Sequence, residues 1–465
     1  MRVALTHGYF LHEDPKERKI MKPYPPLGIL YISAYLQENG YANKVFDTTF
    51  SSKAEMQQRL ADYEPDVIAI YTNLMTKLNV LEWMRFIHNH PQLKKARIIL
   101  GGPDVTYNLE NYLKGGADFI VVGEGEESML ELVANIESGN PFVDHIPGIA
   151  YMNAMGAVEQ NTKRKHIKSV DELPMPNREA IDMQPYLATW KKHHGSSSIT
   201  VSTQRGCPYT CKWCSTAVYG QSYRRRSPEK VADEFLYLKQ AFAPDSVWVV
   251  DDTFTVSHRW LAAFTEVVNN KQAIIPYECI SRADRMNDEV IDFLKKSGCY
   301  RVWIGAESGS QKIIDAMDRR VDVNHVQRII QRANSAGLET GTFIMLGYPG
   351  ETEEDIEATI HHLKVSNPTY FTITVAYPIA GTALHHDIQD IRTNVPDWFT
   401  STDRDIDFKR TYPKHYYKHA LRRVNNEVNY HKAAIASHPF NFMALYLKAK
   451  SLLGKAGMWW VRRFG

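Results

Sequence analysis

Hydrophobic residues in the first 140 positions fall into short runs separated by segments with helical spacing. Apolar runs at 3–5, 44–46, 67–71, 97–100 and 119–122 predict five strands. Apolar residues at helical intervals predict helices near 27–38, 53–62, 78–88, 107–113 and 127–138. Because strands that alternate with helices pair in parallel, this region predicts a doubly wound, Rossmann-like sheet.

The same alternation resumes at residue 196 and continues to about residue 385. Apolar runs at 199–203, 246–250, 274–280, 300–304, 340–346 and 370–375 predict six strands. Each is separated from the next by a loop or a helical segment, and Ser257, Asp288 and Ser310 are suited to capping helices there. Strands and helices in this order predict a partial (β/α)6 barrel like that of a TIM barrel.

The remaining segments are a connector and a tail. In the connector, 141–195, runs at 148–152 and 158–160 predict a hairpin, and the proline-rich stretch 171–177 predicts an extended linker. The tail, 386–465, has apolar residues at helical spacing over 440–453. We therefore expect an α/β chain in four parts, 1–140, 141–195, 196–385 and 386–465, the last of them a basic, aromatic, helical tail.

Composition is that of an ordinary globular protein, with 44% apolar and 23% charged residues among 465. No apolar run approaches the roughly 20 residues that cross a bilayer, and the first residues lack the pattern of a signal peptide. Few cysteines, three of them clustered, indicate a reducing compartment rather than a disulfide scaffold. These features predict a cytoplasmic protein.

The net charge of +2 conceals an asymmetry. Residues 408–465 contain twelve Lys or Arg and one acidic residue, Glu427, a charge of +11, so residues 1–407 sum to −9. Aromatic residues interleave with these cations, and Trp459-Trp460 precede Arg462-Arg463. Such a tail suits an anionic membrane surface, which predicts peripheral membrane contact. A solvated helical cap is the alternative; binding to nucleic acid is less favoured.

Three cysteines, Cys207, Cys211 and Cys214, lie within eight residues in the spacing C-x3-C-x2-C. Three thiolates on one short loop suit a [4Fe–4S] cluster that leaves one iron without a protein ligand. The alternatives are a chance cluster of cysteines and a zinc site completed by a histidine, since structural zinc usually takes four protein ligands.

Polar groups and glycines follow the predicted strands. In the barrel region they include Asp251, Arg282, Glu307-Ser308 and Gly347, and in the first region Gly101-Gly102 and Gly123-Glu124. Active sites lie at the C-terminal ends of parallel strands, and glycine lets a ligand approach the backbone. Charged residues at the end of an apolar strand need a partner, so we expect a ligand-binding site in each region.

The cysteine spacing, with the aromatic Trp213 before the last cysteine, resembles the signature of radical S-adenosylmethionine (SAM) enzymes. In that family the open iron chelates SAM, and an electron from the cluster cleaves it to a 5′-deoxyadenosyl radical. The resemblance implies that Trp213 packs near the adenine and that Gly347 belongs to the turn beneath it. It also implies that Asp251 meets the SAM amino group, that Arg282 pairs with the carboxylate, and that Glu307 and Ser308 contact ribose or carboxylate.

The segment 25–31, the GGPD turn at 101–104 and the VVGEGEES stretch at 121–128 resemble the cobalamin-binding domain that precedes many radical SAM cores. The resemblance implies that Gly101, Gly102, Gly123 and Glu124 bind cobalamin. Members that supply a lower axial ligand carry D-x-H-x-x-G, whereas the corresponding stretch here begins Asp47-Thr48-Thr49 and has no histidine. We therefore expect cobalamin without a protein histidine ligand.

The chain thus resembles the class of radical SAM enzymes that contains the anaerobic magnesium-protoporphyrin IX monomethyl ester cyclase and many cobalamin-dependent methyltransferases. We expect an oxygen-sensitive enzyme that abstracts hydrogen from an unactivated carbon and methylates it. Radical oxidation or cyclisation without cobalamin is one alternative, and a non-enzymatic cobalamin- or metal-binding protein is another. Methylthiolation of tRNA is disfavoured because residues 1–206 contain no cysteine. Expected partners are a small-molecule, hydrophobic substrate and an electron donor such as flavodoxin or ferredoxin.

Overall fold

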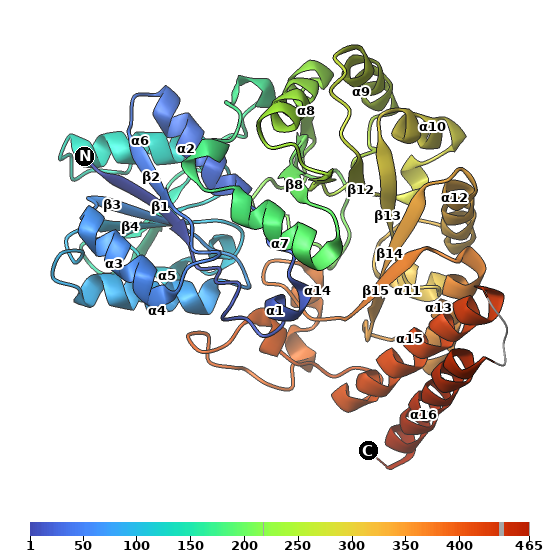
Figure 1. Cartoon of the computed structure of the whole chain (residues 1–465). Helices are drawn as coiled ribbons and strands as arrows, with labels where there is room; N and C mark the ends of the chain where they lie inside the picture. Colours follow the sequence, from blue (N-terminus) through green and yellow to red (C-terminus); the bar gives the residue numbers. More distant parts are fainter. Residues whose placement is uncertain (217, 437–440, 465) are drawn as a thin grey trace. The chain divides into compact units, whose positions relative to one another are not determined.

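The computed structural model describes residues 1–216, 218–436 and 441–464. The chain is an α/β protein that divides into two compact units (Figure 1). Unit 1 consists of residues 1–208, 215–250 and 396–405, and unit 2 of residues 209–214, 251–395 and 406–465. No helix among the described residues is long and apolar enough to cross a membrane.

The first sheet of unit 1 has seven strands in the order β2-β1-β3-β4-β5-β6-β7. The strands are β1 (Val3–His7), β2 (Asn43–Phe46), β3 (Val67–Tyr71), β4 (Arg97–Gly101), β5 (Phe119–Val121), β6 (Ile149–Met152) and β7 (Val158–Gln160). The helices along this part are α1 (Glu17–Ile20), α2 (Leu27–Glu38), α3 (Lys53–Tyr63), α4 (Lys77–Asn89), α5 (Leu109–Lys114) and α6 (Glu126–Glu137). Strands β1 to β5 pair in parallel, which confirms the predicted doubly wound sheet.

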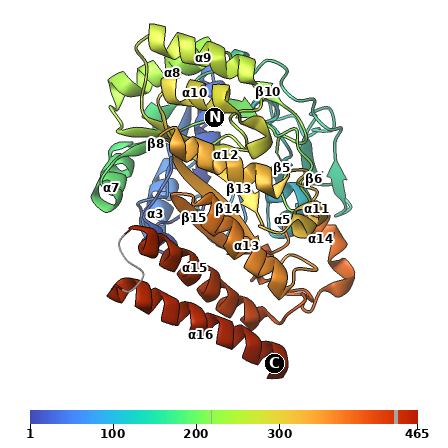
Figure 2. The same ribbon diagram turned by 90° about the vertical axis from the view of Figure 1, so that its right-hand side faces the viewer.

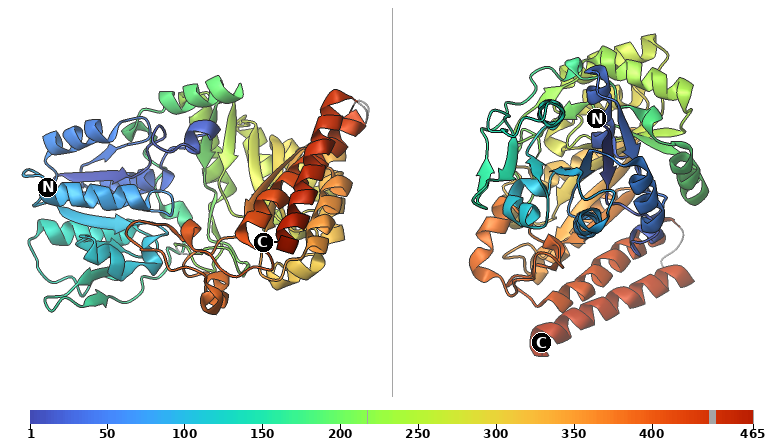
Figure 3. Two further views of the ribbon diagram at one scale, coloured as in Figure 1. Left: turned by 90° about the horizontal axis from the view of Figure 1, so that it is seen from below. Right: turned by 90° about the vertical axis from the view of Figure 1, so that its left-hand side faces the viewer.

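Helices cover both faces of this sheet, as Figures 1 and 3 show. Apolar residues of α2 and α6 pack on one face, and those of α3, α4 and α5 on the other. The strands are buried on both faces, which explains why their sequences are continuous apolar runs. One detail differs from the prediction. The hairpin β6–β7, expected in the connector, extends the sheet because β6 pairs antiparallel with β5.

The connector also contains a helix that the sequence analysis missed, α7 (Gln184–His194). Its buried face is formed by Tyr186, Leu187 and Trp190. The Tyr186 hydroxyl donates to Asp47 Oδ2 at 2.8 Å and lies 2.7 Å from Thr49 Oγ1. The proline at the start of the helix and this apolar spacing were the available signals.

The remainder of unit 1 carries the first two barrel strands, β8 (Ser198–Val201) and β11 (Ser246–Val249), which pair in parallel. Between them lie β9 (Gln204–Arg205), β10 (Arg224–Arg225) and α8 (Pro228–Ala241). Helix α8 begins as the sequence indicates, with Pro228 at its first position and the Ser227 hydroxyl accepting from Lys230 N.

Unit 2 carries the other four barrel strands, in the order β15-β14-β13-β12 and all parallel. They are β12 (Tyr277–Ser281), β13 (Cys299–Glu307), β14 (Glu339–Leu346) and β15 (Tyr370–Val375). The helices are α9 (His258–Asn270), α10 (Asp288–Lys296), α11 (Gln311–Ala316), α12 (Val323–Ser335), α13 (Glu353–Ser366) and α14 (Ala383–Asp387). Short 3₁₀ turns occur in the chain at Val105–Tyr107, Val170–Glu172, Arg178–Ala180, Ala283–Arg285, Gln389–Ile391 and Asp403–Asp405. These six strands confirm the predicted partial barrel.

Two of the three predicted helix caps differ in the structure. Ser257 caps α9 as expected, by accepting from Trp260 N. Asn287, rather than Asp288, caps α10 by accepting from Val290 N, so that Asp288 is the first residue of the helix. Ser310 occupies the cap position of α11 but makes no cap hydrogen bond, and its hydroxyl instead donates to Asp355 Oδ1 at 2.6 Å.

The tail forms two long helices, α15 (Lys414–Ala436) and α16 (Phe442–Phe464), which lie side by side (Figure 2). The predicted helix 440–453 begins outside the described residues, and α16 extends eleven residues beyond its predicted end, from 453 to 464. Helix α15 agrees with the prediction of a helical tail, but its bounds were not predicted. Its Glu427 carboxylate accepts from Lys448 and Ser451 of α16, which joins the pair.

Candidate functional site

The loop between β9 and β10 carries the three clustered cysteines. Cys207 belongs to unit 1, whereas Cys211 and Cys214 belong to unit 2. None of the three is in a disulfide. Among the described residues, no three or more His, Cys, Asp or Glu side chains stand in the arrangement of a metal-ion site. Their assignment to an iron–sulfur cluster stays a prediction.

Two guanidinium groups of unit 2 face the sulfur of Cys211. Arg282 Nη1 lies 3.7 Å from Cys211 Sγ, and Arg319 Nη1 lies 3.6 Å from it. The other nitrogens of Arg282 donate to Asp284 Oδ1 at 2.9 Å and to the Arg319 carbonyl at 2.9 Å. The Tyr209 ring lies 3.9 Å below this guanidinium. Positive charges in these positions suit a sulfur ligand that carries negative charge, as cluster-bound thiolates do.

Arg319 is a site residue that the sequence analysis missed. Its Nη2 donates to the Gly305 carbonyl at 3.0 Å and lies 3.9 Å from Glu307 Oε1. Its Nε is buried and has no hydrogen-bond partner among the described residues. The sequence offered only the pair Arg319-Arg320, shortly after a helix, as an indication of a site residue. Basic residues at the end of a helix are usually exposed to solvent, so the pair did not stand out.

Glu307 ends β13 in an unusual backbone conformation. Its φ is +65°, and the pairing with β14 shifts register between Gly305 and Glu307. Burial raises the pKa of the Glu307 carboxyl, against the effect of Arg319 and Arg282. Since a left-handed non-glycine residue and a weakly paired buried carboxyl both cost free energy, Glu307 is a candidate ligand-binding group.

Trp213 and Gly347 also lie in unit 2. The Trp213 ring packs against a buried apolar cluster that contains Met317, Tyr348 and Leu384. Gly347 follows β14, and its N–H donates to Glu351 Oε2 at 2.5 Å. Burial raises the pKa of Glu351 to about 8.

Asp251 and Ser308 lie at predicted strand ends but differ in their surroundings. Asp251 is buried, and its negative charge, together with burial, raises the pKa of Asp252. The Ser308 hydroxyl is also buried, accepts from Ser310 N at 3.1 Å and lies 3.3 Å from Thr359 Oγ1. Those contacts hold Ser308 within the protein, so the geometry gives its predicted contact with SAM no support.

In unit 1, the predicted glycine turns lie at the carboxyl ends of β4 and β5. A Cβ added to Gly101 would make only ordinary van der Waals contact with Val121, at 3.9 Å, and one added to Gly123 would contact the Val218 carbonyl at 3.7 Å, although Gly123 has φ +88°. Gly102 has φ +111°, and a Cβ there would lie 2.3 Å from the Thr72 carbonyl, so only glycine fits. We call Gly101, Gly102 and Gly123 the glycine ledge, because a large ligand can approach the backbone at these positions.

The region of the missing D-x-H-x-x-G histidine is occupied by an internal hydrogen-bond network. His7 Nε2 lies 3.0 Å from Asp47 Oδ1, and its Nδ1 lies 3.0 Å from Thr48 Oγ1. Tyr9 N donates to the same Nδ1 at 3.2 Å. Both nitrogens of His7 are therefore engaged within the protein.

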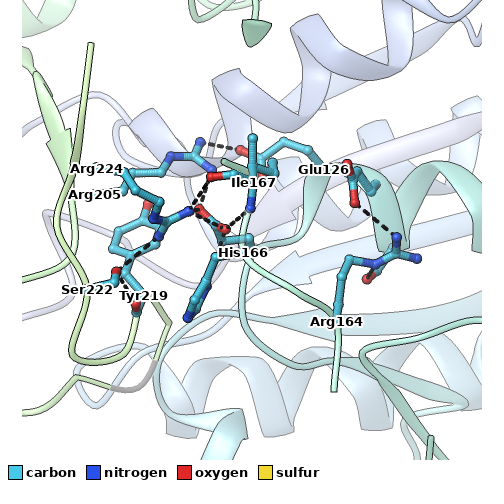
Figure 4. Close-up of polar contacts among 11 residues, drawn as sticks. Glu126, Arg164, His166, Ile167, Arg205, Tyr219, Ser222 and Arg224 are labelled. Carbon is cyan, nitrogen blue, oxygen red and sulfur yellow. Dashed lines mark hydrogen bonds and ion pairs between the residues drawn. The ribbon is translucent and has the colours of Figure 1, made fainter. Parts of the chain in front are cut away.

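Glu124, the other predicted cofactor residue of unit 1, lies in a network of buried charges, of which Figure 4 labels Arg205, Arg224 and His166. Its carboxylate accepts from Arg205 Nη1 at 3.0 Å, from Arg224 Nη1 at 2.7 Å and from Ile167 N at 2.9 Å. His166 Nδ1 lies 3.4 Å away. Burial raises the pKa of Glu124, but the two arginines outweigh burial and hold it below its usual value.

Comparison with known families matches both regions. The family described as "Radical SAM superfamily" matches residues 201–363, and the family described as "B12 binding domain" matches residues 18–133. The chain is a radical SAM enzyme with a B12-binding domain. The first match includes the cysteine loop, and the second includes the glycine ledge.

Several relatives of this radical SAM enzyme are methyltransferases or cyclases by name. A Pyrococcus horikoshii protein named an uncharacterized methyltransferase is 29% identical, over 80% of each chain. The anaerobic magnesium-protoporphyrin IX monomethyl ester cyclase of Rubrivivax gelatinosus is 26% identical over 79% of this chain and 66% of its own. The cytidylyl-2-hydroxyethylphosphonate methyltransferase of Streptomyces wedmorensis is 24% identical over 77% of each.

Solved structures share the fold of this radical SAM enzyme. The cobalamin-dependent enzyme OxsB superposes with a TM-score of 0.76 at 14% identity, covering 98% of this chain and 76% of its own. The methyltransferase TsrM of Kitasatospora setae gives a TM-score of 0.70 at 18% identity, covering 84% and 74%.

These findings confirm the family, the fold class and the enzymatic nature predicted from the sequence. They also support cobalamin-dependent methylation as the main prediction, over the non-enzymatic alternative. A radical SAM enzyme uses a [4Fe–4S] cluster and SAM and needs a reductant, and a B12-binding domain implies cobalamin.

Proposed function

We propose that this protein methylates an unactivated carbon of a small molecule, using SAM, a [4Fe–4S] cluster and cobalamin. The observation that carries the proposal is the arrangement around Cys211. Two arginines face its sulfur and a strained, buried carboxyl, Glu307, lies beside one of them. The B12-binding domain in the same chain favours methyl transfer as the outcome.

Cys207, Cys211 and Cys214 hold the cluster in this proposal. When bound there, the cluster and SAM supply a 5′-deoxyadenosyl radical, and methylcobalamin supplies the methyl group. The chain's own contribution is to hold the Cys211 sulfur through Arg282 and Arg319. The unpartnered Nε of Arg319 is a buried donor that fits an added acceptor.

We assign the contacts with SAM from the side chains whose polar atoms are not all engaged within the protein. Arg282 uses all its nitrogens inside the protein, so we assign it to positioning Cys211 and to providing positive charge for the SAM carboxylate. Glu307 lies beyond hydrogen-bonding distance of Arg319, and we assign its carboxylate to the SAM ribose or amino group. Asp251, Trp213 and Gly347 remain the proposed partners of the amino group and adenine.

Cobalamin is assigned to the ledge formed by Gly101, Gly102 and Gly123. The absence of side chains at these three positions fits the close approach of a large planar ligand to the backbone. We propose that no histidine ligates its cobalt from below, since His7, the histidine that contacts Asp47, has both ring nitrogens engaged.

Anaerobic reconstitution with iron, sulfide and cobalamin, followed by gel filtration, tests this function. We expect about one cobalamin per chain and formation of 5′-deoxyadenosine from SAM under reduction. Cys211→Ala should abolish 5′-deoxyadenosine formation. A C211A protein that still cleaves SAM would refute the cluster assignment. A reconstituted wild-type protein that holds the cluster but retains no cobalamin would refute methylation through cobalamin.

Cyclisation is the second candidate, favoured by the likeness to the Rubrivivax gelatinosus cyclase. Product mass separates the two chemistries. Methylation adds one carbon and two hydrogens to the substrate, whereas oxidative ring formation removes hydrogen.

We further propose that helix α16 contacts an anionic membrane surface, which would place this enzyme at the membrane periphery. Large apolar side chains recur along its exposed face at helical intervals. They are Phe442, Leu445, Tyr446, Leu452, Leu453, Trp459, Trp460 and Phe464. The helix contains five basic residues and no acidic one. A helix with an apolar face, basic flanks and tryptophan at its end suits the boundary between lipid headgroups and acyl chains.

Sedimentation with lipid vesicles tests the membrane contact. The full chain should sediment with phosphatidylglycerol vesicles more than with phosphatidylcholine vesicles, and added salt should weaken this binding. Replacing Trp459 and Trp460 with Ser should reduce it, whereas Phe142→Ser, at an exposed aromatic elsewhere, should not. Equal sedimentation of both variants would contradict the assignment.

A further inference from the structure

The base of the cysteine loop is a very short ladder. Strand β9 pairs antiparallel with β10 through Arg205↔Arg224 and Gln204↔Arg225. All three clustered cysteines lie between these strands, at 207, 211 and 214. A ladder of two residue pairs is marginal by itself, so other contacts must fix where the loop begins and ends.

A single carboxylate spans both strands of that ladder. Glu124 accepts from Arg205 on β9 and from Arg224 on β10, which are paired across the ladder. The Glu124 side chain is only 3% exposed, so water screens these ion pairs little. Figure 4 shows the arginines converging on this region from the two strands.

The Arg205 side chain is held on every side. Its Nη2 pairs with Glu126, and its guanidinium lies 5.5 Å from the Tyr31 ring and 5.4 Å from the Tyr219 ring. Tyr219 itself belongs to the cysteine loop. A guanidinium placed between two rings and two carboxylates has one well-defined position.

The chain passes directly from this arginine to the first cysteine. Gly206 separates Arg205 from Cys207 and has φ +81°. A Cβ at Gly206 would lie 2.3 Å from Ser222 Oγ and 2.5 Å from the Ser222 carbonyl. The backbone therefore has little freedom between the arginine and Cys207, and a displacement of Arg205 would be transmitted to Cys207.

We propose that Glu124 is a positioning residue for the iron–sulfur loop rather than a cobalamin contact. It holds both ends of the loop through Arg205 and Arg224 and thereby sets the place of Cys207. This inference rests on the proposed function, since it takes Cys207 as a cluster ligand. The turn 123–126 after β5, which lies within the B12-binding domain, would then also position the loop that holds the cluster.

Glu124→Gln tests the role, because the amide keeps the shape of the side chain and removes its charge. Hydrogen exchange in the full chain without cofactors should show peptides of residues 204–225 exchanging roughly tenfold faster than in the wild type. After reconstitution, the electron paramagnetic resonance spectrum of the reduced cluster should change, and less iron should be retained. Cobalamin retention should stay at the wild-type level.

Glu127→Gln is the matched control. Glu127 lies three residues after Glu124, in the first turn of α6, and accepts from Arg164 at 3.0 Å rather than from an arginine of β9 or β10. Its substitution should leave exchange in 204–225 and the spectrum unchanged. Should E124Q fail to fold, Arg224→Met removes one of the two contacts and should show the same changes to a smaller degree, while Glu124→Asp should restore part of the protection.

An E124Q protein with wild-type loop exchange and an unchanged cluster spectrum would overturn the proposal. Loss of cobalamin from E124Q with an unchanged loop would return Glu124 to the cobalamin site. A wild type that binds no cluster would refute the proposed function instead, and the exchange measurement would still decide whether Glu124 holds the loop.

Discussion

At the scale of single residues, the site depends on charges that are buried and incompletely paired. Arg319 is the clearest case, because it faces Cys211 at 3.6 Å, and its Nε has no partner among the described residues. Arg320, the next residue, is exposed and pairs with Asp318. Two neighbouring arginines thus occupy opposite environments, and no sequence pattern separates them.

Arg319→Met should lower the reduction potential of the bound cluster. The reduced cluster carries one more negative charge, so removing a nearby positive charge disfavours reduction. Arg320→Met is the matched control and should leave the potential at the wild-type value. Potentiometric titration followed by electron paramagnetic resonance measures both, and equal potentials for the two variants would contradict the role of Arg319.

Glu351 predicts a pH dependence of stability. Burial raises its pKa to about 8, so the neutral form is the one that the fold favours. The stabilisation that neutral Glu351 gives to the fold is fully present below the pKa of the unfolded chain, near 4.5, and is lost as the pH rises through the folded pKa of about 8. Glu351→Gln should therefore lose less thermal stability than the wild type as the pH rises from about 4.5 to about 8. The exposed Glu354→Gln should follow the wild-type curve in thermal melts.

At the scale of elements, periodicity predicted strands and helices well wherever the two faces of an element differ or a strand is buried on both sides. Helix α2 and strands β3 and β15 have the predicted bounds. Helix α7 was missed, and within the predicted helical tail the bounds of α15 were not predicted, because polar and basic residues alternate with the apolar ones in both segments. The pairing of β6 with β5 could not be predicted, since local patterns do not state which strands meet.

The α15–α16 pair is held by close contact as well as by Glu427. A Cβ added to Gly454 would lie 2.7 Å from Arg423 N on α15, so the helices approach closely at this point. Gly454→Val should push them apart and cost about 1–3 kcal/mol. Ala449→Val, on the exposed face of α16, should have almost no effect. Differential scanning calorimetry compares the two variants, and equal melting temperatures would show that α16 does not pack as described.

At the scale of the whole molecule, the two units carry different parts of the chemistry. The glycine ledge belongs to unit 1, which has the buried clusters of the first sheet. Arg282, Arg319 and Glu307 belong to unit 2. The sequence predicted both regions because each has its own motif, but it could not predict which polar groups are satisfied internally. That depends on contacts such as Ser308 with Thr359, made between residues distant in the chain.

The two cofactors should therefore be lost separately. Gly101→Val adds a side chain at the ledge where a Cβ would have no protein atom closer than 3.9 Å, so the strand tolerates it while the ligand would not. We expect G101V to retain iron and 5′-deoxyadenosine formation without cobalamin. Cys211→Ala should retain cobalamin and lose the cluster, and Ala157→Val, on the exposed turn between β6 and β7, should retain both. Metal analysis and the visible spectrum of each reconstituted variant measure how much cluster and how much cobalamin it retains. Loss of both cofactors in G101V would mean that the glycine ledge stabilises the part of the protein that holds the cluster, instead of binding cobalamin.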